Sequence, residues 1–244
     1  MQAMIMAAGK GSRLGKITEG KPKSFAEIKG KKLIEYNLQL LKKYGINEIF
    51  IVIGYCCEAF EKLTEDMEDV HLIYNPFYEM MNVLGSFYMG MDYLKDDFVY
   101  LHADTLCEPL IFERLVYMPL DADAVFPVDF APCNEEAMKV KTREGSIVKI
   151  TKQMSVEEAE GEFIGMAAFR KELLPALRAK TKSLLQEKKF SEYFESAVQR
   201  LIDEEHYRIK AVSTAGAFWT EIDFAEDYEK AAACIPESLT GIFL

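Results

Sequence analysis

The chain has 244 residues, half of them hydrophobic, and a net charge of −11 at pH 7. This length is enough to bury a sizeable core in one α/β domain, and the composition is typical of a globular protein rather than a disordered one. The acidic surplus and the lack of a basic tail argue against a nucleic-acid partner.

The cysteines and the N-terminal segment bear on the cellular compartment. The five cysteines are odd in number and form no C-x-x-C pair, which indicates free thiols in a reducing compartment. The three histidines are too far apart for a zinc pattern. The apolar start is too short and too uncharged for a signal peptide, and no stretch is long enough to span a membrane. We therefore expect a cytoplasmic protein without membrane insertion.

The hydrophobic pattern of the first half alternates between strands and helices. It predicts strands at residues 2–8, 48–53, 70–74 and 98–102, and helices at residues 33–43, 56–64 and 83–94. This alternation is typical of a mostly parallel sheet with helices on both faces.

Strands dominate once the chain has passed Asp121. We expect strands at residues 124–128, 137–142, 146–150, 163–169 and 207–212, and helices at about residues 171–180, 191–203 and 225–233. The turn at residues 143–146 predicts a hairpin. We interpret residues 1–244 as a single domain, with a nucleotide-binding half at about 1–120 and an acceptor-binding half at about 121–244 that share one sheet.

A glycine loop follows the first strand. It reads Gly9-Lys10-Gly11-Ser12-Arg13, and Lys21-Pro22-Lys23 comes shortly after it. Small residues let backbone N–H groups approach phosphate oxygens, and Arg13 and Lys23 are able to neutralise a triphosphate. The alternatives are an ordinary tight turn and a solvated basic face. A dinucleotide fingerprint is excluded because Leu14 stands where its third glycine belongs.

Two aspartates are candidate ligands for Mg²⁺. Asp104 follows the strand predicted at residues 98–102, at the edge where open α/β sheets bind ligands, and Asp223 stands at a strand-to-helix junction. Each would alternatively cap a helix. If the two carboxylates meet in space, they form a metal clamp.

Several motifs in chain order resemble those of the nucleotidyltransferases, the pyrophosphorylases that join a nucleoside triphosphate to a phosphorylated acceptor. The run from Met6 to Leu14 resembles their L-A-A-G-x-G-x-R-[LM] motif. The other matching stretches are Pro22-Lys23, Leu33-Ile34-Glu35-Tyr36, Ile51-Val52-Ile53-Gly54-Tyr55, Asp104 and Glu221-Ile222-Asp223. Together the matches extend from residue 3 to residue 228.

The resemblance implies a Rossmann-like (GT-A-like) α/β domain with a mixed, mostly parallel central sheet and a small β subregion on the acceptor side. It implies that Arg13 holds the leaving phosphates, that Lys23 bridges the reacting phosphates, and that Asp104 and Asp223 hold Mg²⁺. The residues expected to bind the nucleotide are Ala8, Gly9, Gly11, Ser12, Asn82 and Ser86. The family usually has a proline at the position of Lys16, whose role we leave open.

Within the family, the chain is most similar to the small cytidylyltransferases of phosphocholine and 2-aminoethylphosphonate, so we expect CTP as the nucleotide. A cationic acceptor needs carboxylates or aromatic faces, and the candidates are Asp129, Glu162, Tyr193 and Trp219. Trp219 would alternatively be a core residue, and Glu162 part of a solvent-facing turn. Lys139 and Lys152 would either meet phosphate or be exposed strand residues.

Two other functions remain open at this point. One is a sugar-1-phosphate nucleotidyltransferase that uses UTP, dTTP or CTP. The other is a catalytically silent regulatory subunit that binds nucleotide, which the joint presence of Arg13, Lys23, Asp104 and Asp223 argues against. The oligomeric state is open too, with a homodimer among the options.

Overall fold

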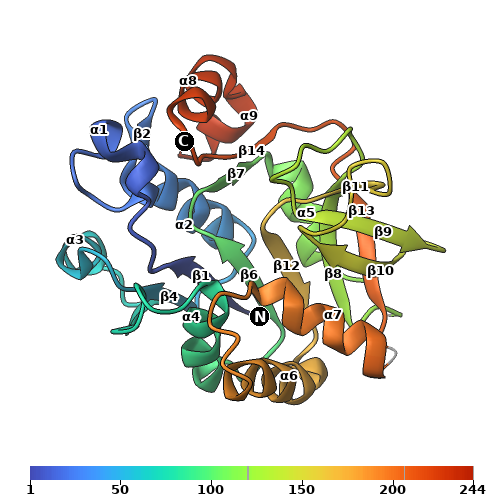
Figure 1. The fold of residues 1–244 in the computed structure, drawn as a ribbon. Coiled ribbons are helices and arrows are strands. Elements are labelled where there is room, and N and C mark those ends of the chain that lie inside the picture. Colours follow the sequence, from blue (N-terminus) through green and yellow to red (C-terminus); the bar gives the residue numbers. More distant parts are fainter. Residues whose placement is uncertain (120, 206, 244) are drawn as a thin grey trace.

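The computed structural model describes residues 1–119, 121–205 and 207–243, without the side chains of Lys16 and Glu205. Within these ranges the centre of the molecule is a ten-stranded mixed sheet (Figure 1). Its order is β11 (Gly161–Phe163), β9 (Lys139–Arg143), β10 (Ser146–Thr151), β13 (Ile209–Ser213), β8 (Ala124–Asp129), β12 (Met166–Phe169), β6 (Phe98–His102), β1 (Gln2–Ala7), β4 (Ile49–Ile53) and β5 (Val70–Tyr74).

The N-terminal half of the sheet is parallel. β1 pairs with β4 and β6, and β4 pairs with β5. All six residues of β1 are buried, because its side chains enter the core on both faces. Parallel strands end at the same edge, so the loops after β1 and β6 lie together there.

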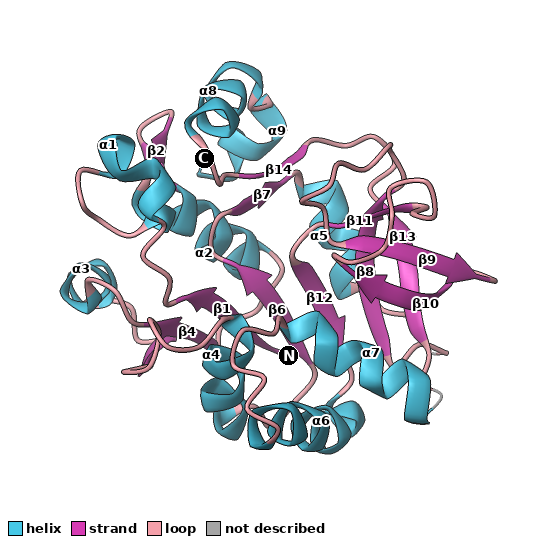
Figure 2. Cartoon of the chain, viewed as in Figure 1, coloured by secondary structure: helices cyan, strands magenta, loops and turns pink. Residues whose placement is uncertain are grey.

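Helices cover both faces of this half (Figure 2). One face packs against α2 (Leu33–Lys43), α3 (Cys57–Thr64) and α5 (Pro109–Val116). The other face packs against α4 (Val83–Gly90), α6 (Leu174–Gln186) and α7 (Phe194–Glu205). Successive residues of β1 supply the two cores in turn, with Ile5 in the first and Met4 in the second.

The second half of the sheet is built differently. β8 runs parallel to β13, whereas the hairpin of β9 and β10 and the pairs made by β11 and β12 are antiparallel. Since β11 pairs with both β9 and β8, five strands close on themselves. The predicted hairpin and the small β subregion are confirmed.

The strand predicted at residues 163–169 is wrong as a single strand. Its residues belong to β11 and β12, which are separated at Gly165, where φ is +78°. Only glycine adopts such a backbone conformation without strain, and it turns the chain from one strand into the next. The helix predicted at about residues 171–180 begins later and runs longer, as α6.

Short elements escaped the prediction because two to four residues carry no periodic pattern. They include the two-stranded sheet of β7 (Thr105–Cys107) and β14 (Trp219–Glu221), which matters most for the site. The others are η1 (Ser12–Leu14), α1 (Gly15–Thr18), η2 (Lys23–Phe25), β2 (Glu27–Ile28), β3 (Lys31–Lys32), η3 (Met91–Tyr93), η4 (Lys171–Leu173), α9 (Glu237–Thr240) and η5 (Gly241–Phe243), and the predicted last helix is α8 (Ala225–Cys234).

None of the helices in the described part of the chain is long and apolar enough to cross a membrane.

Candidate active site

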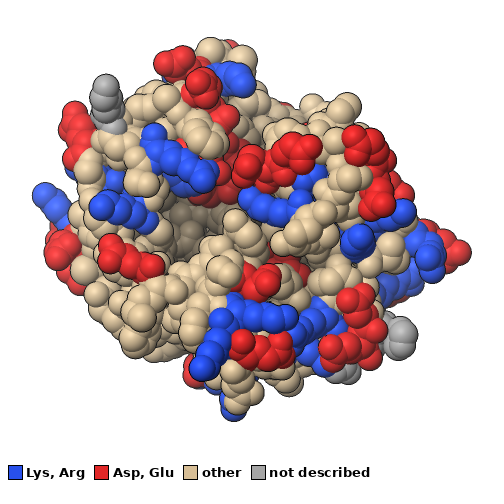
Figure 3. All heavy atoms as spheres, viewed as in Figure 1, with Lys and Arg blue, Asp and Glu red and all other residues tan. Residues whose placement is uncertain are grey.

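A cavity of about 1000 Å³ lies where the loops after β1 and β6 face the strands of the second half. The space-filling view shows this face of the molecule hollowed near its middle, with basic and acidic side chains around the hollow (Figure 3). The predicted site residues that line the cavity are Ala8, Gly9, Gly11, Arg13, Lys23, Asn82, Ser86, Asp104, Glu162, Tyr193, Trp219 and Asp223. Ser12 is exposed outside its lining, and Asp129 lies behind it.

The glycine loop is shaped around Lys23. Gly11 has φ +60°, and a Cβ at Gly11 would collide with the side chain of Lys23. A Cβ at Gly9 would meet nothing within 4 Å, which leaves that backbone open to the cavity. Gly11 therefore serves the fold of the loop, whereas Gly9 leaves room for a ligand.

The ammonium of Lys23 lies between two carboxylates. Its Nζ makes ion pairs with Asp104 and Asp223, and the guanidinium of Arg13 lies 3.9 Å from Asp223. Burial alone would lower the pKa of Lys23, but the two carboxylates outweigh it and hold that pKa well above its usual value. Lys23 is therefore a fixed positive charge at the floor of the cavity.

Pairing of β7 with β14 brings the two aspartates together across more than a hundred residues of sequence. Thr105 pairs with Glu221, and the N–H of Ile222 donates to the carbonyl of Asp104 at 3.1 Å. Neither aspartate caps a helix, so that alternative is wrong. Glu108 precedes α5, and the carboxylate of Asp227 accepts the backbone N–H groups at the start of α8.

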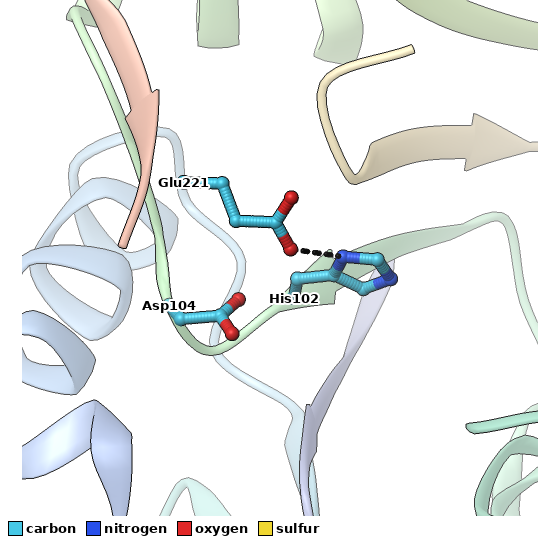
Figure 4. A group of neighbouring side chains, drawn as sticks. All are labelled: His102, Asp104 and Glu221. Atoms are coloured by element: carbon cyan, nitrogen blue, oxygen red, sulfur yellow. Dashed lines mark ion pairs between the residues drawn. The ribbon is translucent and has the colours of Figure 1, made fainter. Parts of the chain in front are cut away.

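A second cluster of side chains, next to the one around Lys23, includes a histidine that the sequence analysis did not identify as a site residue. His102, Asp104 and Glu221 bring one ligand atom each to within 4.8 Å of one another (Figure 4). Nδ1 of His102 lies 3.5 Å from Glu221, and Nε2 lies 2.9 Å from the hydroxyl of Tyr100. Burial lowers the pKa of His102, but Glu221 and then Asp104 and Glu195 raise it to about 9.

The donors at this point suit a hard divalent cation. Asp104 belongs both to the cluster around Lys23 and to the cluster with His102 and Glu221. Carboxylate oxygens are the ligands that Mg²⁺ prefers. The residues present therefore fit such an ion, which Asp104, Asp223 and Glu221 would hold in place of their present ion pairs. The signal for His102 was its place at the end of β6, two residues before Asp104.

Asp129 and Trp219 form a pair on the acceptor side. The indole N–H of Trp219 donates to Asp129 at 2.7 Å, and the hydroxyl of Thr214 donates to the same carboxylate at 3.3 Å. Trp219 is half-buried and lines the cavity, so it is not simply a core residue. This hydrogen bond fixes the orientation of the Trp219 ring.

Glu162 and Tyr193 line the same wall. Glu162 is half-buried on β11, which does not match a solvent-facing turn, and burial followed by the charges of Glu221 and Asp129 raises its pKa to about 7. The ammonium of Lys152 lies over the ring of Tyr193, 4.9 Å from the ring centroid.

Lys139 is neither exposed nor in contact with the cavity. It is fully buried, and its ammonium donates to the carbonyls of Glu135 at 2.7 Å, Lys152 at 3.1 Å and Ala137 at 3.4 Å. It therefore ties two segments of the cavity wall together.

Two residues expected to bind the nucleotide, Asn82 and Ser86, already make hydrogen bonds within the protein. Asn82 caps α4 by accepting the N–H of Val83 at 2.8 Å, and its amide donates to the carbonyl of Ser191 at 3.0 Å. The hydroxyl of Ser86 accepts from Asn75 at 2.9 Å, which leaves its own hydrogen available to a ligand. The side chain of Lys16, left open above, lies outside the described residues.

The cavity joins a glycine loop, a basic pair and convergent carboxylates, which together define a site for transfer of a phosphorylated group. Residues 3–200 match the model of the MobA-like NTP transferase domain family. The chain belongs to this family and is a nucleotidyltransferase. Enzymes of the family generally use a divalent metal ion.

Named relatives and solved structures refine this placement. The chain is 31% identical to a CTP:phosphoglutamine cytidylyltransferase of Campylobacter jejuni, over 94% of this chain and 98% of that one. It is 35% identical to a choline-phosphate cytidylyltransferase of Streptococcus pneumoniae, over 56% of this chain and 57% of that one. The fold matches the inositol-1-phosphate CTP transferase of T. maritima with a TM-score of 0.82 at 23% identity, over 99% and 95% of the two chains.

These matches confirm the predicted family, the predicted α/β fold and the resemblance to cytidylyltransferases. They also support an enzyme rather than a silent regulatory subunit.

Proposed function

We propose that this chain is a Mg²⁺-dependent cytidylyltransferase that transfers CMP from CTP to a small phosphate or phosphonate with a cationic head, the class to which phosphocholine and 2-aminoethylphosphonate belong. The observation that carries this is the position of Lys23, beside the glycine loop and between carboxylates from both halves of the chain. Both named relatives are cytidylyltransferases, and choline and glutamine both carry nitrogen groups.

The reaction needs little covalent work from the protein. An oxygen of the acceptor phosphate attacks the α-phosphorus of CTP, a P–O bond forms there, and pyrophosphate leaves with the electron pair of the broken bond. Catalysis then rests on positioning and on neutralising negative charge. A divalent ion held by Asp104 and Asp223 would supply part of that neutralisation.

The chain's own cations divide the remaining work. Lys23, at the floor of the cavity, meets the reacting phosphates, and Arg13, exposed at its rim, meets the leaving pyrophosphate. Gly9 leaves its backbone free to approach the nucleotide, and Ser86 offers its hydroxyl hydrogen to the base. All of these residues lie in the proposed nucleotide half, at about 1–120. The proposed acceptor half, at about 121–244, belongs to the same single domain.

The cation of the acceptor belongs beside Glu162 and Trp219. The carboxylate of Glu162 has no hydrogen bond or ion pair with any residue that the structure describes, so an ammonium would give it the partner it lacks. The ring of Trp219, oriented by Asp129, adds an aromatic face, and Tyr193 extends the same wall.

A panel of pyrophosphate-release assays tests the proposal. It crosses CTP, UTP, dTTP and ATP with phosphocholine, 2-aminoethylphosphonate and several sugar 1-phosphates, with Asp104→Asn as the blank. We expect release only with Mg²⁺, CTP and an acceptor with a cationic head. Activity confined to UTP or dTTP with a sugar 1-phosphate would replace this proposal by the sugar-nucleotide alternative.

A further inference from the structure

Three side chains with metal-binding atoms converge in the cavity. His102, Asp104 and Glu221 point toward one another from the end of β6, the residues after it and β14 (Figure 4). Nδ1 of His102 lies 3.5 Å from Glu221, and one ligand atom of each residue lies within 4.8 Å of the other two. Ligand atoms around a four-coordinate ion lie about 3.4 Å apart. His102 and Glu221 already have this spacing, and the most distant pair needs an adjustment of about 1.4 Å.

A buried tyrosine prepares the imidazole for metal binding. Tyr100 is fully buried, and its hydroxyl lies 2.9 Å from Nε2 of His102. When this hydroxyl accepts the hydrogen of Nε2, the neutral ring turns its Nδ1 lone pair toward Asp104 and Glu221. Metal-binding histidines are almost always held in this way through their second nitrogen. In the ion-free chain a proton on Nδ1 faces Glu221, and a metal ion would replace that proton.

An unpartnered hydroxyl lies beside the same group. Thr105 is fully buried, and its Oγ1 has no hydrogen-bond partner among the residues that the structure describes. A Cβ on Gly165 would lie 2.7 Å from Nδ1 of His102 and 2.9 Å from that Oγ1, so both polar atoms border the space that the glycine leaves open. A water molecule on a bound ion would give the Thr105 hydroxyl the partner it lacks.

The imidazole distinguishes this group from the carboxylates around Lys23. Imidazole nitrogen suits Zn²⁺ and related transition metals, whereas Mg²⁺ prefers oxygen ligands. Two carboxylates, one imidazole and a water molecule match a four-coordinate zinc site with an open position. All three side chains line the cavity, and those of His102 and Asp104 are 20% and 16% exposed, so an ion can reach them.

We propose that His102, Asp104 and Glu221 form a second divalent-cation site, which binds Zn²⁺ in preference to Mg²⁺ and needs no nucleotide. A carboxylate has two oxygens, so Asp104 can hold the ion with one of them while Oδ2 stays with Lys23. The Mg²⁺ site of the proposed function also uses Asp104 and Glu221, so bound Zn²⁺ keeps Mg²⁺ out. Inhibition by Zn²⁺ therefore rests on the proposed function, whereas the binding of Zn²⁺ does not.

Binding to the nucleotide-free chain tests the site itself. Titration calorimetry measures the Kd of Zn²⁺ and of Mg²⁺. The visible spectrum of Co²⁺ reports the coordination, because four-coordinate Co²⁺ absorbs far more strongly than the hydrated ion. For the wild-type chain we expect Zn²⁺ to bind at least about tenfold more tightly than Mg²⁺, and Co²⁺ to show the four-coordinate spectrum.

Two variants assign that binding, and a third is the matched control. His102→Gln removes the nitrogen ligand, so it should weaken Zn²⁺ binding by about 10–100-fold without weakening Mg²⁺ binding. Tyr100→Phe keeps the imidazole but removes the hydroxyl at Nε2, and it should weaken Zn²⁺ binding by about tenfold. His71→Gln removes an exposed histidine of β5 outside the cavity lining, and it should keep both wild-type Kd values.

The outcomes separate this inference from the proposed function. A Zn²⁺ affinity that survives His102→Gln, or a six-coordinate Co²⁺ spectrum, would overturn the site. If Zn²⁺ binds as expected but no acceptor supports pyrophosphate release from CTP with Mg²⁺, the proposed function fails and the site stands. In an active enzyme, Zn²⁺ should inhibit wild type more strongly than His102→Gln. Equal inhibition of the two would overturn the competition with Mg²⁺.

Discussion

Lys139→Met removes the buried ammonium that ties the acceptor wall together while keeping most of the aliphatic stem. Three carbonyls lose their donor, at 2.7, 3.1 and 3.4 Å, and a charge-assisted hydrogen bond is worth about 1.5–3 kcal/mol net. The variant also avoids the cost of burying an ammonium, and the carbonyls regain some water. We therefore expect a loss of about 2–4 kcal/mol in the free energy of unfolding.

For a chain of this size, 1 kcal/mol corresponds to about 2–4 °C in Tm, so the variant should melt about 4–16 °C lower. Scanning calorimetry measures this. Lys141→Met, an exposed lysine on the same strand, is the control and should stay within about 1 °C. Because Lys139 anchors Glu135, Ala137 and Lys152, the KM for the acceptor should rise more than the KM for CTP. A Tm within 1 °C of wild type, or equal effects on both KM values, would refute this reasoning.

Three further predictions concern charged groups of the cavity. The carboxyl of Glu162 is protonated below its raised pKa of about 7. The kcat/KM for an amine-bearing acceptor should therefore rise with pH up to about 7 and then level off. With the same acceptor, Glu162→Gln should lack this rise. The pKa of His102 is about 9 in the folded chain against about 6.5 unfolded, so its contribution, about 3 kcal/mol at most, is complete below pH 6.5 and lost as pH rises through 9. In urea unfolding, the free energy of unfolding of His102→Gln should therefore fall less between pH 6 and pH 10 than that of wild type. A stability difference between the two proteins that is the same at both pH values would contradict the ion pair with Glu221. Lys23→Met frees both aspartates from an ammonium, so calorimetry without nucleotide should show tighter Mn²⁺ binding than in wild type, and weaker binding would place the ion elsewhere.

The sequence predicted the elements that have strong periodicity. The helix at Leu33–Lys43 and the strands at Val70–Tyr74 and Phe98–His102 have the predicted bounds, because each has an apolar pattern of its own period between clear breaks. The split between β11 and β12 was missed, since a single glycine within an apolar run is compatible with a continuous strand as well as with a turn.

Side-chain partners across the fold were harder to predict. The motifs identified Asp104 and Asp223, but only the pairing of β7 with β14 brings them together, and strands of three residues carry no periodic signal. Lys139 was expected to be exposed or bound to phosphate, because a lysine in a strand is seldom fully buried. Its burial depends on carbonyls from two other segments, which no local pattern reveals.

The reaction centre formed by Lys23, Asp104 and Asp223 is the central claim, and the rate of pyrophosphate release by Asp104→Ala with saturating CTP, Mg²⁺ and acceptor tests it most directly. Removing one preorganised charge-stabilising group typically costs about 10²–10³ in rate. The account predicts a loss of at least that size, with the variant still folded by circular dichroism. A folded variant that releases pyrophosphate within a few-fold of the wild-type rate would contradict it.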